Sequence, residues 1–290
     1  MQKKKADSLY FIVNKYNEAA LIYQDLLYKN PNNRYANLME NFCKPYKEQF
    51  FIKVPKDTVV LSDNYGYDVE IIVDSFKLSP YEVTNVQFAR FLNEYGSFKV
   101  IKNENYGQLM ININGKLGVE KSRIYLENGI YKVEPGFEFH PVIYVSWYGA
   151  NEFCKFYNLR LPTEAEWELA ASYGHNNRLK FSGTNLDSSL TEFAWYLDNS
   201  ANGIKGIGLK KPNVIGLFDM TGNVWEWCSS WSITYNKEYL NFTESDTDFQ
   251  KKVFRGGSFN DLNDNCLVNK RNRGLKNFIN NNLGFRVVLP

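Results

Sequence analysis

Histidine is scarce in this chain, which has only His140 and His175 among its 290 residues. An iron or zinc centre built on three histidines therefore cannot come from this chain alone. Cysteine is also sparse, and its four residues show neither a C-x-x-C pair nor the spacing of a disulfide framework. They are Cys43, Cys154, Cys228 and Cys266. Few and scattered cysteines indicate a reducing compartment, in which the thiols are free and mostly buried.

An excess of charge of either sign is also missing. The chain has 34 Lys and Arg against 32 Asp and Glu, a net charge of +2, so we expect no nucleic-acid partner. No apolar run approaches the roughly 20 residues of a membrane span. Three lysines follow Gln2, but Ala6-Asp7-Ser8 stands where a signal peptide needs its apolar segment. We expect a cytoplasmic protein, or a periplasmic or exported one if a signal sequence preceded this chain.

The first 47 residues have the periodicity of helices. Apolar residues recur at helical spacing from Leu9 to Tyr16, and Asn30-Pro31 interrupts the pattern before a second apolar stripe. The segment from Asn17 to Asn32 resembles half of a tetratricopeptide unit, although no second copy follows. We predict a helical hairpin over residues 1–47, which packs on the main domain or docks a partner, and a second domain over residues 48–290.

Residues 48–290 combine many aromatic residues with short elements. Aromatic residues make up 16% of the chain, which favours a core of stacked rings and irregular loops over an aliphatic helical bundle. Capping boxes at Thr84–Gln87 and Thr163–Glu166 predict helix starts. The Asn-Gly turns at 114–115 and 128–129 predict hairpins, the first of them after a strand at 110–113. The fold class that follows is α+β, with little regular structure.

The stretch Gly216–Trp227 carries the densest signal. Thr221-Gly222-Asn223 has the composition of a tight turn, and the strand-prone residues after it place Trp225 and Trp227 on one face and Glu226 on the other. Glu226 and Asp219 thus lie on either side of a turn with free backbone carbonyls, which is a plausible oxygen site for Ca²⁺. A solvated hairpin with aromatic residues in the core explains the same pattern.

This stretch also resembles a motif of the sulfatase-modifying-factor family, whose type member is the formylglycine-generating enzyme. Five further blocks resemble the family's motifs in the family's order. The six blocks are Tyr81–Asn85, His140–Trp147, Arg160–Glu168, Gly222–Trp227, Arg255–Ser258 and Leu283–Arg286. The resemblance implies a C-type-lectin-like α+β fold from about residue 50 to the end of the chain.

The resemblance also implies positions for a copper site. The enzyme binds Cu(I) through two cysteines that follow its "GGS" block and uses O₂ to oxidise a substrate cysteine. Those positions are Asp261 and Cys266 here, while Trp225 and Ser258 match residues that line the enzyme's substrate groove. Because a hard carboxylate cannot replace a thiolate for Cu(I), we do not expect copper binding. Cys266 is then a small buried residue rather than a catalytic thiol.

A calcium site transfers more completely. The resemblance implies that one structural Ca²⁺ is held by the side chains of Asp219 and Glu226 and by the carbonyls of Gly222 and Val224. All four positions carry a residue that suits an oxygen-ligated cation.

The function that we expect is a non-catalytic binding or scaffold module with a protein or peptide partner. One alternative is a copper- and O₂-dependent oxidase that converts a sulfatase cysteine to formylglycine with altered metal ligation. The other is a carbohydrate-binding lectin, which would need an exposed calcium ion. Asp261 argues against the oxidase, whereas Trp225, Ser258 and Cys266 argue for it.

Overall fold

The computed structural model describes residues 50–290 except 64–65, 119, 174–178 and 233–249, together with a few isolated positions before residue 50. The predicted N-terminal helical hairpin and His175 lie outside the described residues, apart from those isolated positions. The chain divides into two units, Met1–Phe51 and Ile52–Pro290, and the second contains every predicted site residue.

The second unit mixes helices and strands, as predicted. Its helices are α4 (Asn85–Tyr95), α5 (Trp147–Phe156), α6 (Glu164–Ser172) and the short α7 (Leu190–Phe193), with 3₁₀ turns η3 (Asp187–Ser189) and η6 (Asn263–Asn265). Thr84 and Thr163 are the N-caps of α4 and α6, and each forms both hydrogen bonds of a capping box, as the sequence predicts. Among the described helices, none combines the length and hydrophobicity that a membrane crossing needs.

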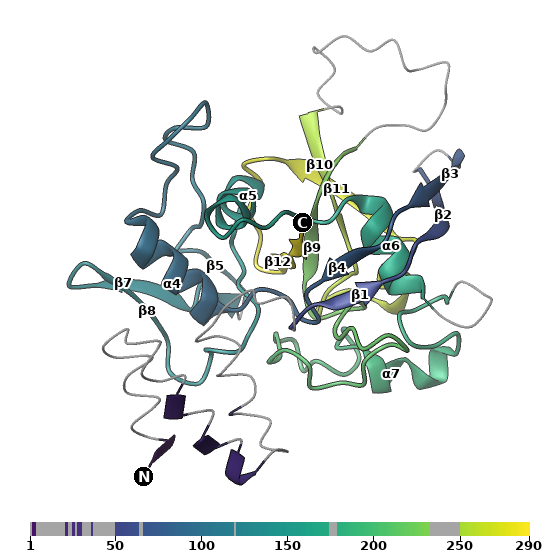
Figure 1. The fold of residues 1–290 in the computed structure, drawn as a ribbon, viewed down its shortest axis with the longest axis horizontal. Helices are drawn as coiled ribbons and strands as arrows, with labels where there is room; N and C mark the ends of the chain where they lie inside the picture. Colours follow the sequence, from purple (N-terminus) through teal and green to yellow (C-terminus); the bar gives the residue numbers. More distant parts are fainter. Residues whose placement is uncertain are drawn as a thin grey trace. The chain divides into compact units, whose positions relative to one another are not determined.

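The strands form small sheets around one larger sheet (Figure 1). The central sheet has the order β11-β10-β9-β12, and a second sheet has the order β1-β4-β13. The pairs β2–β3, β5–β6 and β7–β8 are separate hairpins. The bounds are β1 Ile52–Val54, β2 Asp57–Ser62, β3 Asp68–Val73, β4 Phe76–Leu78, β5 Lys116–Leu117, β6 Glu120–Lys121, β7 Ile124–Glu127, β8 Ile130–Val133, β9 Trp225–Trp231, β10 Lys251–Arg255, β11 Arg271–Leu275, β12 Leu283–Gly284 and β13 Val288–Leu289.

One of the two predicted Asn-Gly hairpins is correct. The turn at 128–129 joins β7 to β8, with Glu127 opposite Ile130. The turn at 114–115 joins no strands, because the hairpin that follows it pairs Leu117 with Glu120. The strand predicted at 110–113 is therefore wrong. Ile111 forms only an isolated bridge with Val145, so a long-range contact determines the conformation of this segment.

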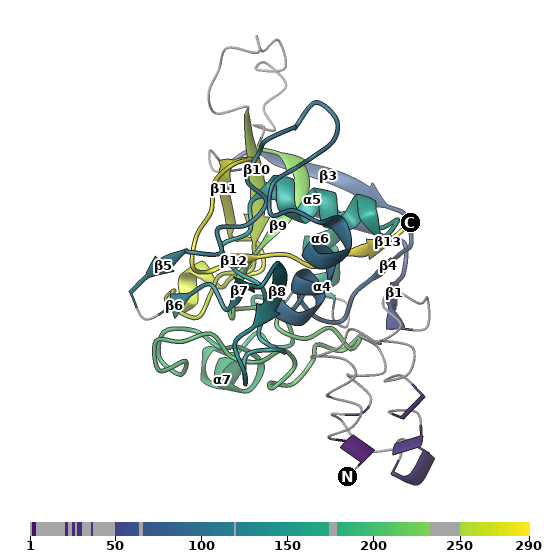
Figure 2. The same cartoon turned by 90° about the vertical axis from the view of Figure 1, so that its left-hand side faces the viewer.

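The core is aromatic, as the composition predicts. Phe88 of α4 stacks on Phe153 of α5 with ring centroids 5.8 Å apart, and Phe153 meets Phe285 edge to face at 5.3 Å. Figure 1 and Figure 2 both show α4 beside β8, which it contacts. Helix α6 contacts β2 and β3 as well as β9 and β10, so it joins the first hairpin to the central sheet.

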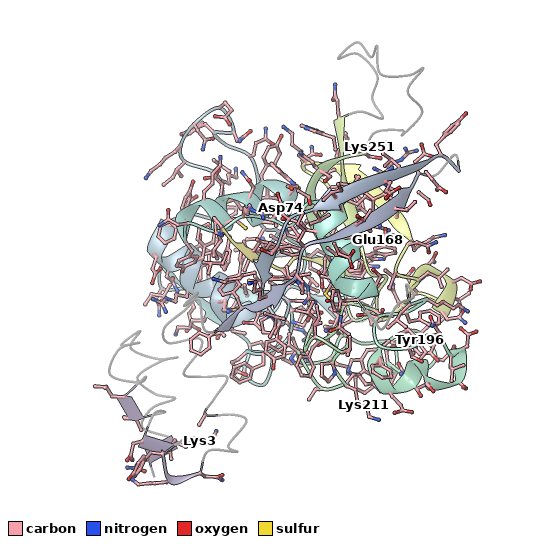
Figure 3. The ribbon with its side chains drawn as sticks, turned by 45° about the vertical axis from the view of Figure 1, so that its right-hand side comes forward. Lys3, Asp74, Glu168, Tyr196, Lys211 and Lys251 are labelled. Atoms are coloured by element: carbon pink, nitrogen blue, oxygen red, sulfur yellow. The ribbon has the colours of Figure 1, made fainter. Side chains whose placement is uncertain are left out.

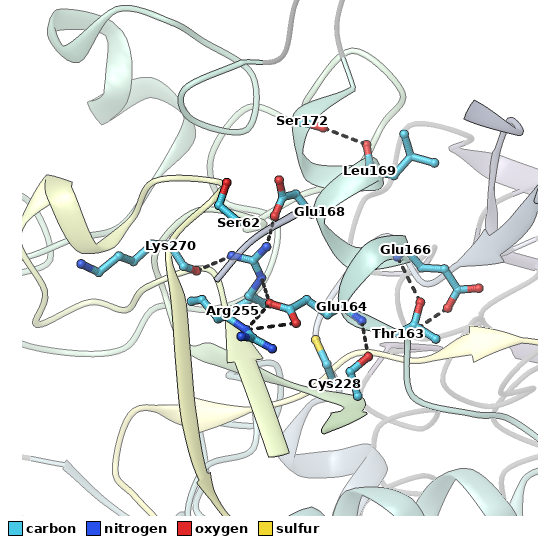
Figure 4. A network of polar contacts seen from close by, with 12 residues as sticks. Ser62, Thr163, Glu164, Glu166, Glu168, Leu169, Ser172, Cys228, Arg255 and Lys270 are labelled. Carbon is cyan, nitrogen blue, oxygen red and sulfur yellow. Dashed lines mark hydrogen bonds and ion pairs between the residues drawn. The ribbon is translucent and has the colours of Figure 1, made fainter. Parts of the chain in front are cut away.

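A buried ionic network fastens α6 to the central sheet (Figure 4). The Arg255 guanidinium lies 3.2 Å from Glu164 and also pairs with Glu168. Arg271 lies 2.8 Å from Glu164. All four side chains are at most 4% exposed. Their charges balance two against two, which a buried ionic cluster requires. Glu164 is thus a structural residue, although its partners in the sheet are not readable from the helix sequence.

Candidate functional site

The site begins at the turn before β9. Gly222 and Asn223 adopt left-handed backbone angles, with φ of 78° and 58°, as the turn composition predicts. The turn packs against Trp195, whose carbonyl accepts a hydrogen bond of 2.8 Å from the Asn223 amide. A Cβ atom at Gly222 would stand 2.2 Å from the same carbonyl oxygen. The close approach of the two backbones therefore requires glycine here.

Glu226 forms a fully buried ion pair. Its two carboxylate oxygens each accept a hydrogen bond of 2.7 Å from the Arg286 guanidinium. The indole of Trp167 donates a third, also of 2.7 Å. The carboxylate predicted to bind Ca²⁺ thus has Arg286 and Trp167 as its partners in the structure. Arg286 comes from the last of the six sequence blocks, 60 residues further along the chain.

Two further acids lie close to this pair. Glu82 and Asp219 are each 2% exposed. Burial, and next the negative charge of Asp219, raises the pKa of Glu82 well above its usual value. Glu82 accepts a hydrogen bond of 3.0 Å from Asn223 through Oε1, whereas Oε2 has no hydrogen-bond partner in the part of the chain that the structure describes. Burial alone would lower the pKa of Arg286, but this pKa is raised, because the negative charges of the surrounding carboxylates outweigh the effect of burial.

Sequence reasoning missed Glu82, although the residue stands in the first of the six blocks. The site contains three buried carboxylates, Glu82, Asp219 and Glu226, and one buried guanidinium. The negative charge of Asp219 also acts on the Lys210 ammonium. Within the described parts of the chain, no three His, Cys, Asp or Glu side chains are arranged to hold a metal ion. The predicted calcium site needs only two carboxylate side chains beside two backbone carbonyls, so the absence of a group of three among the described residues does not exclude it.

The structure brings together Trp225, Ser258 and Asp261. The indole of Trp225 donates a hydrogen bond of 2.9 Å to Asp261 Oδ2, and the Ser258 hydroxyl donates to the same oxygen. Asn265 Nδ2 donates to Oδ1 at 3.2 Å, and Asn282 donates to the Ser258 oxygen at 3.0 Å. Asp261 is thus the acceptor at the centre of a hydrogen-bonded network, which we call the Asp261 cluster.

Cys266 lies next to this cluster in a hydrophobic environment. It is 0% exposed and packs with four apolar or aromatic residues, Phe181, Leu190, Ala194 and Tyr196. Burial, together with the negative charge of Asp261, raises the pKa of its thiol to about 12. A thiol that stays neutral at physiological pH is a poor nucleophile and a poor metal ligand. A carboxylate with three donors beside a neutral thiol does not fit a two-thiolate Cu(I) site.

Comparison with known proteins shows which family the chain resembles. The profile of the sulfatase-modifying factor enzyme 1-like domain matches residues 38–290. The chain belongs to this family. The match includes every residue of the acidic site and of the Asp261 cluster, so both lie within the sulfatase-modifying-factor domain.

The curated relatives differ in length and in name. Serine/threonine-protein kinase Pkn1 of Chlamydia trachomatis serovar L2 is 33% identical over 277 residues, 91% of this chain and 42% of the kinase. The pkn1 kinase of Chlamydia pneumoniae is 33% identical over 224 residues, 75% of this chain and 33% of the kinase. The mouse formylglycine-generating enzyme is 27% identical over 260 residues, 79% of this chain and 70% of the enzyme. The chain therefore spans less than half the length of these kinases.

Solved structures support the sulfatase-modifying-factor fold. PvdO from Pseudomonas aeruginosa superimposes with a TM-score of 0.61 at 19% identity and covers 82% of this chain and 93% of its own. Treponema denticola variable protein 1 superimposes with a TM-score of 0.59 at 24% identity, with coverage of 82% and 94%. Similarity at this level of identity establishes the fold alone.

Proposed function

We propose that this sulfatase-modifying-factor domain is a non-catalytic recognition module that binds a protein or peptide. The proposal rests on Asp261 and Cys266, which stand at the two positions where the resemblance implies copper-binding thiolates. Asp261 accepts hydrogen bonds from Trp225, Ser258 and Asn265. Cys266 is buried, with its thiol pKa raised to about 12. Neither group supplies the soft anionic sulfur that Cu(I) requires.

The relatives are compatible with this proposal. One member of the family, from cattle, is named inactive C-alpha-formylglycine-generating enzyme 2, and it is 31% identical over 159 residues, half of this chain. The kinases named above contain a similar domain within a longer chain. A domain that recurs beside another activity is well suited to recognition.

A Cu(I) titration of the purified protein, against a chromophoric chelator, tests the proposal. We expect no binding that competes with the chelator and no oxygen uptake with a cysteine-containing sulfatase-motif peptide. Asp261→Cys is the matched variant, because it supplies a second sulfur beside Cys266, and we expect it to gain Cu(I) binding. Turnover by the unmodified protein would overturn the proposal.

The alternative function is an oxidase with altered metal ligation. It is favoured by the similarity to the mouse formylglycine-generating enzyme and by the presence of Trp225, Ser258 and Cys266 in adjoining parts of one site. Such an enzyme would have to deprotonate Cys266 against burial and against the charge of Asp261. Oxygen uptake that depends on Cys266 and disappears in Cys266→Ser would establish it.

We also propose one structural Ca²⁺ beside the turn. Asp219 and the carbonyls of Gly222 and Val224 remain from the predicted set, and Glu82 replaces Glu226, which Arg286 and Trp167 occupy. The support is that three buried carboxylates adjoin one buried guanidinium, and that Glu82 Oε2 has no hydrogen-bond partner among the described residues. Carboxylate oxygens of this kind are ligands that Ca²⁺ prefers.

Calcium titration calorimetry tests this ion. Because the pKa of Glu82 is raised, binding should release a proton, and the measured heat should change with the ionisation enthalpy of the buffer. Glu82→Gln should abolish that dependence and weaken binding. Equal heats for the variant and the unmodified protein would remove Glu82 from the site.

A further inference from the structure

Lys252 of β10 is buried between two tryptophans. It pairs across the sheet with Trp231 of β9, and its ammonium lies 3.6 Å from the centre of the Trp231 ring and 4.7 Å from that of Trp147. The side chain is 4% exposed. Among the described residues its ammonium donates a single hydrogen bond, of 2.6 Å to the Ser229 carbonyl, and its other close neighbours there are the two indole rings.

A second lysine faces the same indole. The Lys276 ammonium lies 5.4 Å from the Trp231 ring and 5.2 Å from the Tyr148 ring. The backbone holds it there, because the Trp147 amide donates a hydrogen bond of 3.0 Å to the Lys276 carbonyl. Lys252, Lys276 and Trp231, which we call the lysine–tryptophan site, therefore come from three separate segments of the chain.

Among the described residues, no carboxylate offsets these charges. Burial and the positive charge of Lys276 lower the pKa of Lys252 to about 8, with no acid acting against them. Neither ammonium forms an ion pair in the described part of the chain, in contrast to Arg255, Arg271 and Arg286. A buried cation without a counter-ion is unfavourable unless an anion joins it. Within the described part of the chain, the two ammoniums therefore have no anionic partner.

The surface beside the two lysines is aromatic and exposed. Lys252 pairs with Gly274 of β11, and Phe278 packs over that glycine, because a Cβ there would stand 2.9 Å from the Phe278 ring. Trp231 and Phe278 are 43% and 39% exposed. Figure 3 labels the neighbouring Lys251 at the start of β10. Exposed aromatic residues next to cations are typical of the energetic centres of protein interfaces.

We propose that the lysine–tryptophan site binds an acidic peptide segment of a partner protein. A carboxylate of the segment pairs with the half-buried Lys276 ammonium and offsets the charge of the buried Lys252 at longer range, and its apolar side chains cover Trp231 and Phe278. The inference rests on the proposed function as a recognition module and specifies its partner by charge. The site is separate from the Asp261 cluster, because it shares none of that cluster's residues.

Fluorescence anisotropy with a labelled peptide of alternating Glu and Leu tests the proposal, with the matching Gln and Leu peptide as the probe control. We expect binding of the acidic peptide alone, weakened when salt rises from about 0.1 M to about 1 M. Lys276→Met, at a half-buried position that does not threaten folding, should weaken binding on the order of tenfold. Lys252→Met should do the same.

Lys251→Met is the matched control, since this neighbouring lysine faces away from Trp231 along the alternation of the strand. It should bind as the unmodified protein does. Inorganic phosphate as a competitor separates a general oxyanion site from one that needs the peptide. Phosphate at low millimolar concentration displaces the labelled peptide only from a general oxyanion site. Equal binding of the Glu and Gln peptides, or unchanged binding by Lys276→Met, would overturn the proposal.

The outcome is independent of the copper experiment. Oxygen uptake would overturn the recognition function even if the acidic peptide binds. Failure of the acidic peptide without copper turnover would overturn only the charge assigned to the partner.

Discussion

At the scale of single residues, buried charge determines what each part of the site can do. Glu226 and Arg286 satisfy each other, whereas Glu82 retains an unpartnered oxygen. Lys252 has no anionic partner among the described residues, and burial and Lys276 lower its pKa to about 8. A satisfied pair contributes to structure, and an unsatisfied group calls for a ligand or a proton. The residues that attract attention in the sequence are therefore not always those that remain available in the fold.

Glu226→Gln should lower the free energy of unfolding by about 3–5 kcal/mol, because it leaves the Arg286 charge buried without its partner. Denaturant titration measures this loss, which we expect to be equal in calcium and in chelator. Glu127→Gln is the control, since its pair with Lys132 is exposed and should cost less than about 1 kcal/mol. A loss seen only with calcium would make Glu226 a calcium ligand instead.

His140 should make the protein sensitive to mild acid. Burial, together with the positive charges of Arg123 and Lys205, lowers its pKa to about 4 from 6.5. Between these values the unfolded chain binds the proton and the folded chain does not, so stability falls as pH drops from 6.5 to 4. His140→Asn should reduce that fall by at most about 3 kcal/mol. Parallel stability curves for the two proteins would contradict the expectation.

At the scale of elements, local signals specify where helices and turns begin. Thr84 and Thr163 cap their helices, and the 128–129 turn closes its hairpin. The turn at Gly222 combines such a local signal with a tertiary one, because its backbone angle suits glycine and its surroundings leave no space for a side chain.

Gly222→Ala should destabilise the domain by at least about 2 kcal/mol more than Gly216→Ala. Both glycines have positive φ, so both variants carry the strain of a left-handed residue. Only at Gly222 does a Cβ meet the Trp195 oxygen, at 2.2 Å, whereas at Gly216 the nearest atom is 3.6 Å away. Thermal unfolding of the two variants compares them, and equal midpoints would mean that the Trp195 backbone moves aside freely.

At the scale of the whole molecule, the second unit contains an extensive core of its own. Its first strand pairs with β4, which also pairs with the last strand. Both ends of the unit thus meet in one small sheet, and the aromatic core and both ionic networks lie between them in sequence.

A truncated chain that begins at residue 48 should therefore fold alone. We expect its thermal midpoint to stay within about 3 °C of that of the full chain, since a loss of 1 kcal/mol would move it by roughly that amount. Calorimetry of the two proteins measures the difference. Aggregation of the truncated chain would indicate that residues 1–47 cover an apolar surface of the second unit.

The sequence by itself determined the family, the α+β class, the capped helices and the turn before β9. These features depend on neighbouring residues, whose hydrogen bonds and backbone angles are read from short patterns. Only the tertiary structure decided which polar and charged side chains meet. Glu226 with Arg286, Asp261 with Trp225, and Lys252 with Lys276 are pairs that lie far apart along the chain. Nothing local distinguishes a carboxylate that will pair with a guanidinium from one that will be buried without a counter-ion, because its partner arrives through folding.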